Sequence, residues 1–386
     1  MRSKLKILPF LLLLLMGQCK QRYDSPYHPP VTGYLVVEGF IAGNAPTQFT
    51  LSRVIKLPGD STIPLEIGAK LQVEGADNSV YPLAETASGV YTANSLPLNP
   101  AVRYRLRITT RNGETYLSNP TPYKTAPPID SVNWVQDPSG VTFYVNTHDP
   151  TNATRYYQWD FAETWEYHSA EYSGLKYIPK GGSMGFDTIV ERPDSELIDV
   201  CYQGDHSSPL LIASTTRLAQ DVVYRQQLQF IPAASQKLSV EYSMIVRQHA
   251  LTDSAYTFLS LMKANTEQLG TIFDAQPSEL KGNIHSLNQP DEPVVGYVSA
   301  GAVQQQRIFI SVTQLNQWGY SFNCERPDTL VTSYSQFPIF YADGAWIPLY
   351  KKYGPFGFLG WATNARNCID CTYQGGTTTK PSFWPY

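Results

Sequence analysis

The chain has 386 residues, of which 16% are charged and 13% are aromatic, including 26 tyrosines, and its formal net charge is −4. A net acidic chain without a basic run is a poor candidate for binding nucleic acid. Tyrosine-rich, charge-poor sequences suit half-buried pleated surfaces, so the composition favours a mainly β protein that is long enough for two domains.

The first eighteen residues are typical of an export signal. Three basic residues precede a short apolar run over 8–16. This run is too short to span a bilayer, which takes about 20 residues, but it fits a signal peptide. Met-Gly-Gln-Cys at 16–19 stands where a lipobox is expected. We therefore predict a lipoprotein signal peptide over residues 1–18 and a lipid on Cys19. The alternative is a plain secretory signal with an incidental cysteine.

The next segments predict a tether and a first domain. Residues 19–32 contain three prolines and suggest an extended link to the membrane. The clearest strand follows at 102–108, where apolar side chains alternate with arginines. Asn112-Gly113 predicts a type I′ hairpin turn and a return strand at 115–118. With further strand patterns at 33–41 and 49–55, these elements predict an antiparallel β-sandwich over residues 33–126.

A joint and a second domain come next. Pro127-Pro128 cannot continue a strand ladder, so the pattern breaks there. Alternation restarts at 141–146 and recurs at 157–161, 238–246 and 308–312. One helix is predicted near 252–269, because Thr252 suits an N-cap and Ala255, Phe258, Leu259 and Met262 follow at helical spacing. Residues 127–386 are therefore predicted to form a larger, immunoglobulin-like β-sandwich with an inserted helix.

Four cysteines remain after the signal, and an even number in an exported chain indicates disulfides. Cys368 and Cys371 are three positions apart, so they could close across a β-turn. That would leave Cys201 to pair with Cys324. A zinc half-site or a redox pair is the alternative for this CxxC, but the chain lacks a matching second ligand pair and a βαβ context.

Three motifs resemble catalytic patterns without their usual context. Residues 181–185 match G-x-S-x-G around Ser183, but a strand-like segment follows where a nucleophile elbow requires a helix. His148-Asp149 and Asp205-His206 each place an imidazole beside a carboxylate, and such pairs are mostly solvated turn residues. We expect no enzymatic activity and no catalytic, cofactor-binding or metal-binding residues.

An aromatic-rich stretch is the best candidate for ligand contact. It comprises Trp165, Tyr167, Tyr172 and Tyr177 around a glycine turn. Exposed aromatic side chains can stack on sugars or peptide side chains. The alternative, which the sequence favours, is that these residues form part of a sandwich core.

Several segments in order along the mature chain resemble one family. They include Tyr34–Gly39, Ala126–Val132, Thr154–Trp159 and the tail motif Cys368–Cys371. Further matches are Ala255-Tyr256, Gly270–Asp274, Gly282–Ile284, Gly375-Gly376 and Pro381–Trp384. Together they resemble the Bacteroidota lipoproteins grouped as "domain of unknown function 4249".

This resemblance implies a function but no site residues. Members of the family are typically encoded beside TonB-dependent receptors that import nutrients. We therefore expect a non-enzymatic outer-membrane lipoprotein that faces outward and helps such a receptor to capture a ligand. The basic residues after Cys19 leave the periplasmic face open as an alternative location. The alternative functions are a stand-alone glycan- or peptide-binding surface lipoprotein and a surface hydrolase.

Overall fold

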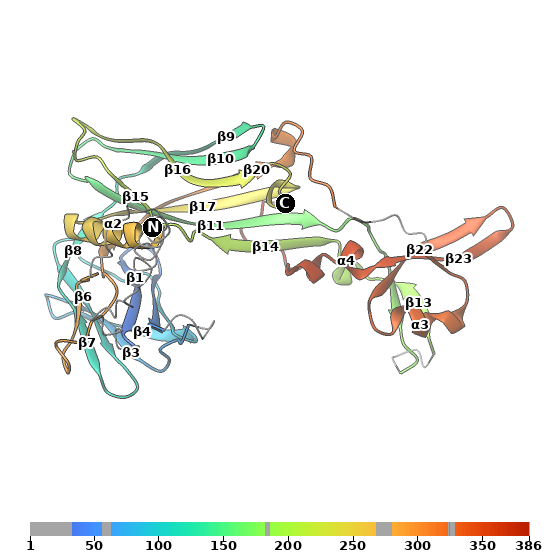
Figure 1. The fold of residues 1–386 in the computed structure, drawn as a ribbon, viewed down its shortest axis with the longest axis horizontal. Helices are drawn as coiled ribbons and strands as arrows, with labels where there is room; N and C mark the ends of the chain where they lie inside the picture. Colours follow the sequence, from blue (N-terminus) through green and yellow to red (C-terminus); the bar gives the residue numbers. More distant parts are fainter. Residues whose placement is uncertain are drawn as a thin grey trace, which may run out of the picture.

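The computed structural model describes residues 33–55, 63–181, 186–267, 280–322, 324 and 329–385. The predicted signal peptide, the tether and Cys19 lie outside this part of the chain. Within it, no helix has both the length and the apolar character needed to cross a membrane. The protein is mainly β, as predicted, and it is elongated. A strand ring and a two-sheet sandwich lie side by side at one end of its long axis, and a distal lobe lies at the other end (Figure 1).

The first unit is a closed ring of eight strands rather than the predicted open sandwich. Its strand order is β6-β3-β4-β5-β2-β1-β19-β8, and β8 pairs back onto β6. Alternate side chains of these strands point inward and form one buried core. Two further strands, β7 and β18, extend the sheet beyond β6. The strands are β1 (Leu35–Ala42), β2 (Thr47–Arg53), β3 (Lys70–Gly75), β4 (Val80–Ala87), β5 (Val90–Ala93), β6 (Arg103–Thr109), β7 (Thr115–Ser118), β8 (Thr121–Thr125), β18 (Ile284–Ser286) and β19 (Ala300–Ala302).

The strand that closes the ring comes from far along the chain. β19 pairs in parallel with both β1 and β8, so the predicted unit of residues 33–126 lacks a strand that it needs. Gly301 allows this close approach, because a Cβ atom there would lie 1.9 Å from the Lys124 carbonyl oxygen. A three-residue strand has no detectable alternation, which is why the sequence pattern did not reveal it.

The Asn112-Gly113 hairpin forms with a different turn. β6 and β7 pair as predicted, with Ile108 opposite Tyr116. Only Gly113 has a positive φ, of 90°, whereas a type I′ turn requires positive φ at both central residues. Thr110 instead bonds to Glu114, which leaves a three-residue loop with glycine in the left-handed position.

The second unit is a sandwich of two antiparallel sheets that share one core. Its largest side chains include Trp159, Phe143 and Tyr242, all almost completely buried. Gln248 anchors the joint to this core, because its side-chain amide donates to the Pro127 carbonyl oxygen at 2.7 Å. One sheet has the order β16-β10-β9 and the other β14-β11-β17-β20, with β15 beside β11. The strands are β9 (Ile129–Asp137), β10 (Gly140–Asp149), β11 (Tyr156–His168), β14 (Val200–His206), β15 (Leu211–Ser214), β16 (Asp221–Pro232), β17 (Glu241–Ala250) and β20 (Gln304–Ser311).

A distal lobe, which the sequence did not predict as a separate body, lies at the other end of the molecule (Figure 1). It joins an excursion between β11 and β14 to a segment after β20, and its small core includes Phe337, Tyr341 and Trp361. The elements are β12 (Leu175–Ile178), β13 (Thr188–Glu191), β21 (Thr329–Val331), α3 (Phe337–Tyr341), β22 (Trp346–Gly354), β23 (Gly357–Ala365) and α4 (Arg366–Ile369).

All four predicted cysteines form disulfides, but the predicted pairing is wrong. Cys201 bonds to Cys371 and Cys324 bonds to Cys368. Cys368 lies in the short helix α4, and Cys371 begins the 3₁₀ turn that follows it after Asp370, so the CxxC segment is not a β-turn. One bridge closes the distal lobe and the other fixes the returning C-terminal segment to the sandwich.

Candidate functional site

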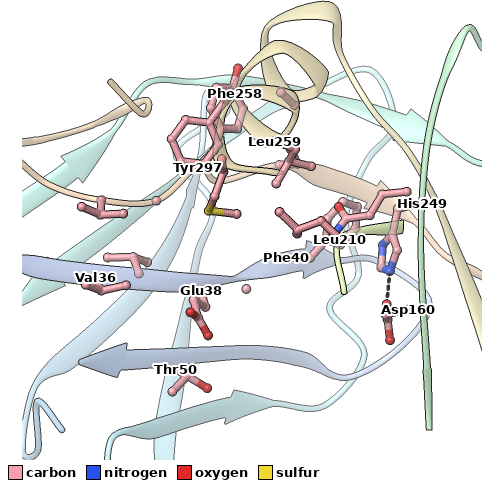
Figure 2. Close-up of a pocket in the computed structure, with 18 of the residues that line it drawn as sticks. Val36, Glu38, Phe40, Thr50, Asp160, Leu210, His249, Phe258, Leu259 and Tyr297 are labelled. Carbon is pink, nitrogen blue, oxygen red and sulfur yellow. Dashed lines mark hydrogen bonds and ion pairs between the residues drawn. The ribbon is translucent and has the colours of Figure 1, made fainter. Parts of the chain in front are cut away.

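The candidate site is a pocket of about 470 Å³ at the junction of the ring and the sandwich. β1 and β2 of the ring form one wall, and β11 and β17 of the sandwich form another. Helix α2 (Asp253–Glu267) lies above both walls (Figure 2). The volume is typical of sites for small organic molecules.

Helix α2 supplies an apolar roof. Thr252 caps it as predicted, since its hydroxyl accepts from the Ala255 amide at 3.2 Å. Ala255, Phe258, Leu259 and Met262 form one face of the helix and line the pocket. The predicted apolar stripe therefore lines a cavity and is not packed entirely into the hydrophobic core.

Polar contacts at both ends hold the roof in place. At its start, the Tyr156 hydroxyl donates to the Asp253 carboxylate at 2.6 Å. At its end, Lys263 donates to the Leu210 carbonyl oxygen at 2.6 Å, and Glu267 accepts from the Leu210 amide at 2.9 Å. Leu210 itself lines the pocket. The helix is therefore positioned before any ligand binds.

A charged cluster stands at the sandwich side of the pocket. His249 Nε2 lies 2.7 Å from an Asp160 carboxylate oxygen, and Arg247 contacts the other oxygen. Burial alone would raise the pKa of the Asp160 carboxyl, but the hydrogen bond to His249 and the charges of His249 and Arg247 lower it overall. The contacts with His249 and Arg247 thus stabilise the negative charge of the Asp160 carboxylate.

Two groups in the lining keep unused binding capacity. His249 is 8% exposed, its ring packs edge-on against Phe40 at 4.6 Å, and its Nδ1 atom has no hydrogen-bond partner among the described residues. Glu38 on β1 is exposed and makes no ion pair within the described part of the chain. The pocket therefore combines an apolar roof with one uncompensated carboxylate.

The predicted aromatic residues do not form one surface. Trp165 and Tyr167 are buried in the sandwich core, where the Tyr167 hydroxyl donates to the Cys371 carbonyl oxygen at 2.8 Å. Tyr177 packs against the core of the distal lobe, and burial together with a hydrogen bond to Asp187 raises its pKa to about 12. Only Tyr172, at 57% exposure, is available on the surface. The core alternative is thus correct for Trp165 and Tyr167.

The imidazole–carboxylate pairs have structural or solvated surroundings. His148 contacts Asp130 at 2.8 Å rather than its neighbour Asp149. Asp149 accepts from the Thr151 hydroxyl and from backbone amides of the following turn, and these bonds outweigh burial and lower its pKa to about 2. Asp205 and His206 are exposed on β14. Ser183 lies outside the described residues, and the described part of the chain has no cluster of three potential metal ligands.

The pocket residues other than the helix stripe were missed by sequence reasoning. Glu38, Asp160 and His249 occupy three strands that are distant in sequence, and each sits in an ordinary alternating pattern. The one available signal was the Thr252 cap followed by an apolar helix face in an otherwise β chain.

The strand ring, the sandwich and the junction pocket together define a β-rich protein with a cavity between two units. The chain belongs to the family described as "Domain of unknown function (DUF4249)", whose sequence profile matches residues 20–307. This match covers the ring, helix α2 and the sandwich as far as the middle of β20, and it stops before the strands of the second half of the distal lobe. No curated protein matches the chain.

Two solved structures share limited similarity with the chain. One is a two-domain fibronectin type III segment from chicken tenascin, at 8% identity and a TM-score of 0.16, covering 57% of this chain and 93% of the tenascin chain. The other is chitinase ChiA74 from Bacillus thuringiensis, at 13% identity and a TM-score of 0.15, covering 48% of this chain and 30% of the chitinase.

Proposed function

We propose that this protein is a non-enzymatic binding protein that captures a small molecule in the junction pocket. The observation that carries the proposal is the preformed apolar roof of α2 above a partly polar floor. Ligand sites are typically concave, mostly apolar and provided with a few polar groups that fix orientation. The second unit, with two sheets around one core, is proposed to be an immunoglobulin-like sandwich that supports the pocket.

The lining selects a class of ligand. An apolar body would bury against Phe258, Leu259 and Met262, where each Å² of apolar surface removed from water contributes about 25 cal/mol. A cationic or hydrogen-donating end would face Glu38, the carboxylate without a compensating cation. The unused His249 Nδ1 offers a further hydrogen-bonding position to a ligand group that shifts the Phe40 ring. The ligand is therefore a small amphipathic molecule with a positive or donor end.

Family membership supports a cellular context for this binding. A lipid on Cys19 would hold the protein on the outer membrane, facing outward, and the proposed partner is a TonB-dependent receptor. Confinement beside the receptor raises the effective concentration, so weak contacts are enough for transfer of a ligand. A stand-alone binding protein is the alternative.

Two probes with the same apolar body test the pocket. Calorimetric titration with tryptamine, which is cationic, and with indole-3-acetate, which is anionic, separates the contributions of shape and charge. We expect tryptamine to bind and indole-3-acetate to bind more weakly. If neither probe binds, the proposal for the pocket is wrong.

Two cellular experiments test the context. A Cys19→Ala variant should lose palmitate incorporation and sedimentation with membranes. A tagged protein isolated from solubilised outer membranes should bring a TonB-dependent receptor with it. Recovery of the tagged protein alone would favour the stand-alone alternative.

A further inference from the structure

The β22–β23 hairpin exposes several large apolar side chains to solvent. Tyr350, Tyr353, Phe356, Phe358 and Leu359 are each between 44% exposed and fully exposed. The hairpin projects from the distal lobe at the end of the molecule opposite the ring (Figure 1). Soluble proteins rarely gather this much apolar surface without a use for it, and an open strand pair of this kind invites aggregation.

Both faces of the ribbon are apolar. Tyr353 and Phe358 are cross-strand partners whose rings lie 5.6 Å apart, so they share one face. Leu359 lies in a register irregularity, and its side chain comes within 3.0 Å of the position that a Cβ atom on Gly354 would occupy. Because Gly354 directly follows Tyr353 in β22, this contact places Leu359 on the other face. Phe356, in the two-residue tip, is fully exposed. A hairpin that docks on a flat protein surface needs only one apolar face. An apolar medium that surrounds the tip can contact both faces.

The base of the hairpin is held firmly, and only its outer part is bare. β21 pairs with β23 at Thr363, Ala362 and Trp361, and Trp361 is buried in the lobe core. Between Trp361 and the tip, no third strand pairs with the hairpin among the described residues. The tip is thus a stiff projection with a fixed direction, and insertion would cost little conformational entropy.

The charge of the hairpin differs from that of the whole chain. Lys351 and Lys352 are exposed on β22, and no acidic residue occurs between Asp343 and Asp370, although the chain as a whole has a net charge of −4. Tyrosine and phenylalanine are favoured at the membrane–water interface, and lysine side chains there reach the anionic phosphates.

We propose that the tip of the β22–β23 hairpin inserts into the interface of a lipid bilayer that contains anionic phospholipid. Phe356 and its neighbours enter the boundary of the acyl chains, while Lys351 and Lys352 contact phosphate groups. With the lipid proposed on Cys19 before the ring, this second contact lays the long axis of the body along the membrane. The surface is separate from the junction pocket, so either proposal can fail alone.

Tryptophan fluorescence on the full chain tests the insertion. A Phe356→Trp variant is bound to vesicles of phosphatidylcholine and phosphatidylglycerol whose acyl chains carry bromine, a contact quencher. After subtraction of the parent signal, we expect emission at 356 to shift to shorter wavelength and to lose intensity. The matched control is Tyr224→Trp, at an exposed position of β16 on the sandwich, which should show neither change.

Charge variants and a second lipid mixture complete the test. Replacing Lys351 and Lys352 by Gln should lower the equilibrium constant for tip insertion by about 30-fold with anionic lipid, and have little effect with phosphatidylcholine alone. Quenching that is equal at positions 356 and 224 would overturn the proposal. Unquenched emission at 356 with all lipids would also overturn it and would point to a protein partner for the hairpin.

Discussion

The junction pocket and the distal hairpin both contain several apolar side chains, which are covered in the pocket and exposed on the hairpin. In the pocket, α2 covers these side chains, and polar contacts at Asp253 and Leu210 hold the cover in place. On the hairpin, Phe356 is fully exposed, and Tyr353 remains 65% exposed beside Phe358. An enclosed apolar surface suits a small molecule, whereas a bare one suits an extended medium. We therefore propose that the junction pocket serves capture of a ligand and that the hairpin serves attachment to a membrane.

The largest expected effects come from the two disulfides. Cys201–Cys371 fixes the C-terminal segment to the sandwich, and Cys324–Cys368 lies in the distal lobe. The Cys201–Cys371 bridge has a sequence separation of 170, so the Cys201→Ser/Cys371→Ser double variant should lose about 4–5 kcal/mol of unfolding free energy on the chain-entropy model. Denaturant titration measures this loss.

The matched control is the Cys324→Ser/Cys368→Ser double variant, which removes the bridge of the distal lobe. Hydrogen exchange should then increase in the lobe while the strands around the pocket keep their protection. Equal loosening at both ends would show that the two regions are not separate in stability.

Asp160 provides the next test, on the pocket side. Replacing it by Asn leaves Arg247 and His249 without their carboxylate and should cost about 1–3 kcal/mol at neutral pH. Because the pKa of Asp160 is lowered in the folded state, its contribution is present above its unfolded value of about 3.9 and is lost as pH falls through the folded value.

The free-energy difference between wild type and Asp160→Asn should therefore shrink as the solution is acidified below about pH 4. Urea titrations at a series of pH values measure it. A difference that is independent of pH would contradict the charged contact.

Glu38 tests the charge preference of the pocket. Its replacement by Gln should weaken tryptamine binding by about 10-fold, which corresponds to about 1.4 kcal/mol, and leave indole-3-acetate binding unchanged or slightly stronger. Because Glu38 is exposed and unpaired among the described residues, folding stability should not change. Equal weakening of both probes would indicate a change of shape and not of charge.

A small stability effect is also expected at the tip of the hairpin. A Phe356→Ser variant should change the unfolding free energy by less than about 0.5 kcal/mol, since this side chain is fully exposed. A large loss of stability would show that the Phe356 ring has a structural partner in the protein.

The same contrast separates what the sequence could predict from what it could not. Local patterns predicted the strands, the Thr252 cap and the apolar face of α2, because each signal lies within one element. The ring closure by Ala300–Ala302, the disulfide partners and the meeting of Glu38 with His249 all depend on contacts between distant segments. The alternating pattern also could not place Tyr177 and Trp361 in a separate lobe. A buried aromatic residue gives the same sequence pattern whichever hydrophobic core it belongs to.

Occupation of the space under α2 is the most direct test of the account. Leu259 lines the pocket, whereas Leu261, two residues along the same helix, is exposed, so Leu259→Trp and Leu261→Trp form a matched pair. Tryptamine should bind wild type and Leu261→Trp alike by calorimetry and should bind Leu259→Trp at least about 10-fold more weakly. Equal affinity for all three folded proteins would contradict a ligand site in the junction pocket.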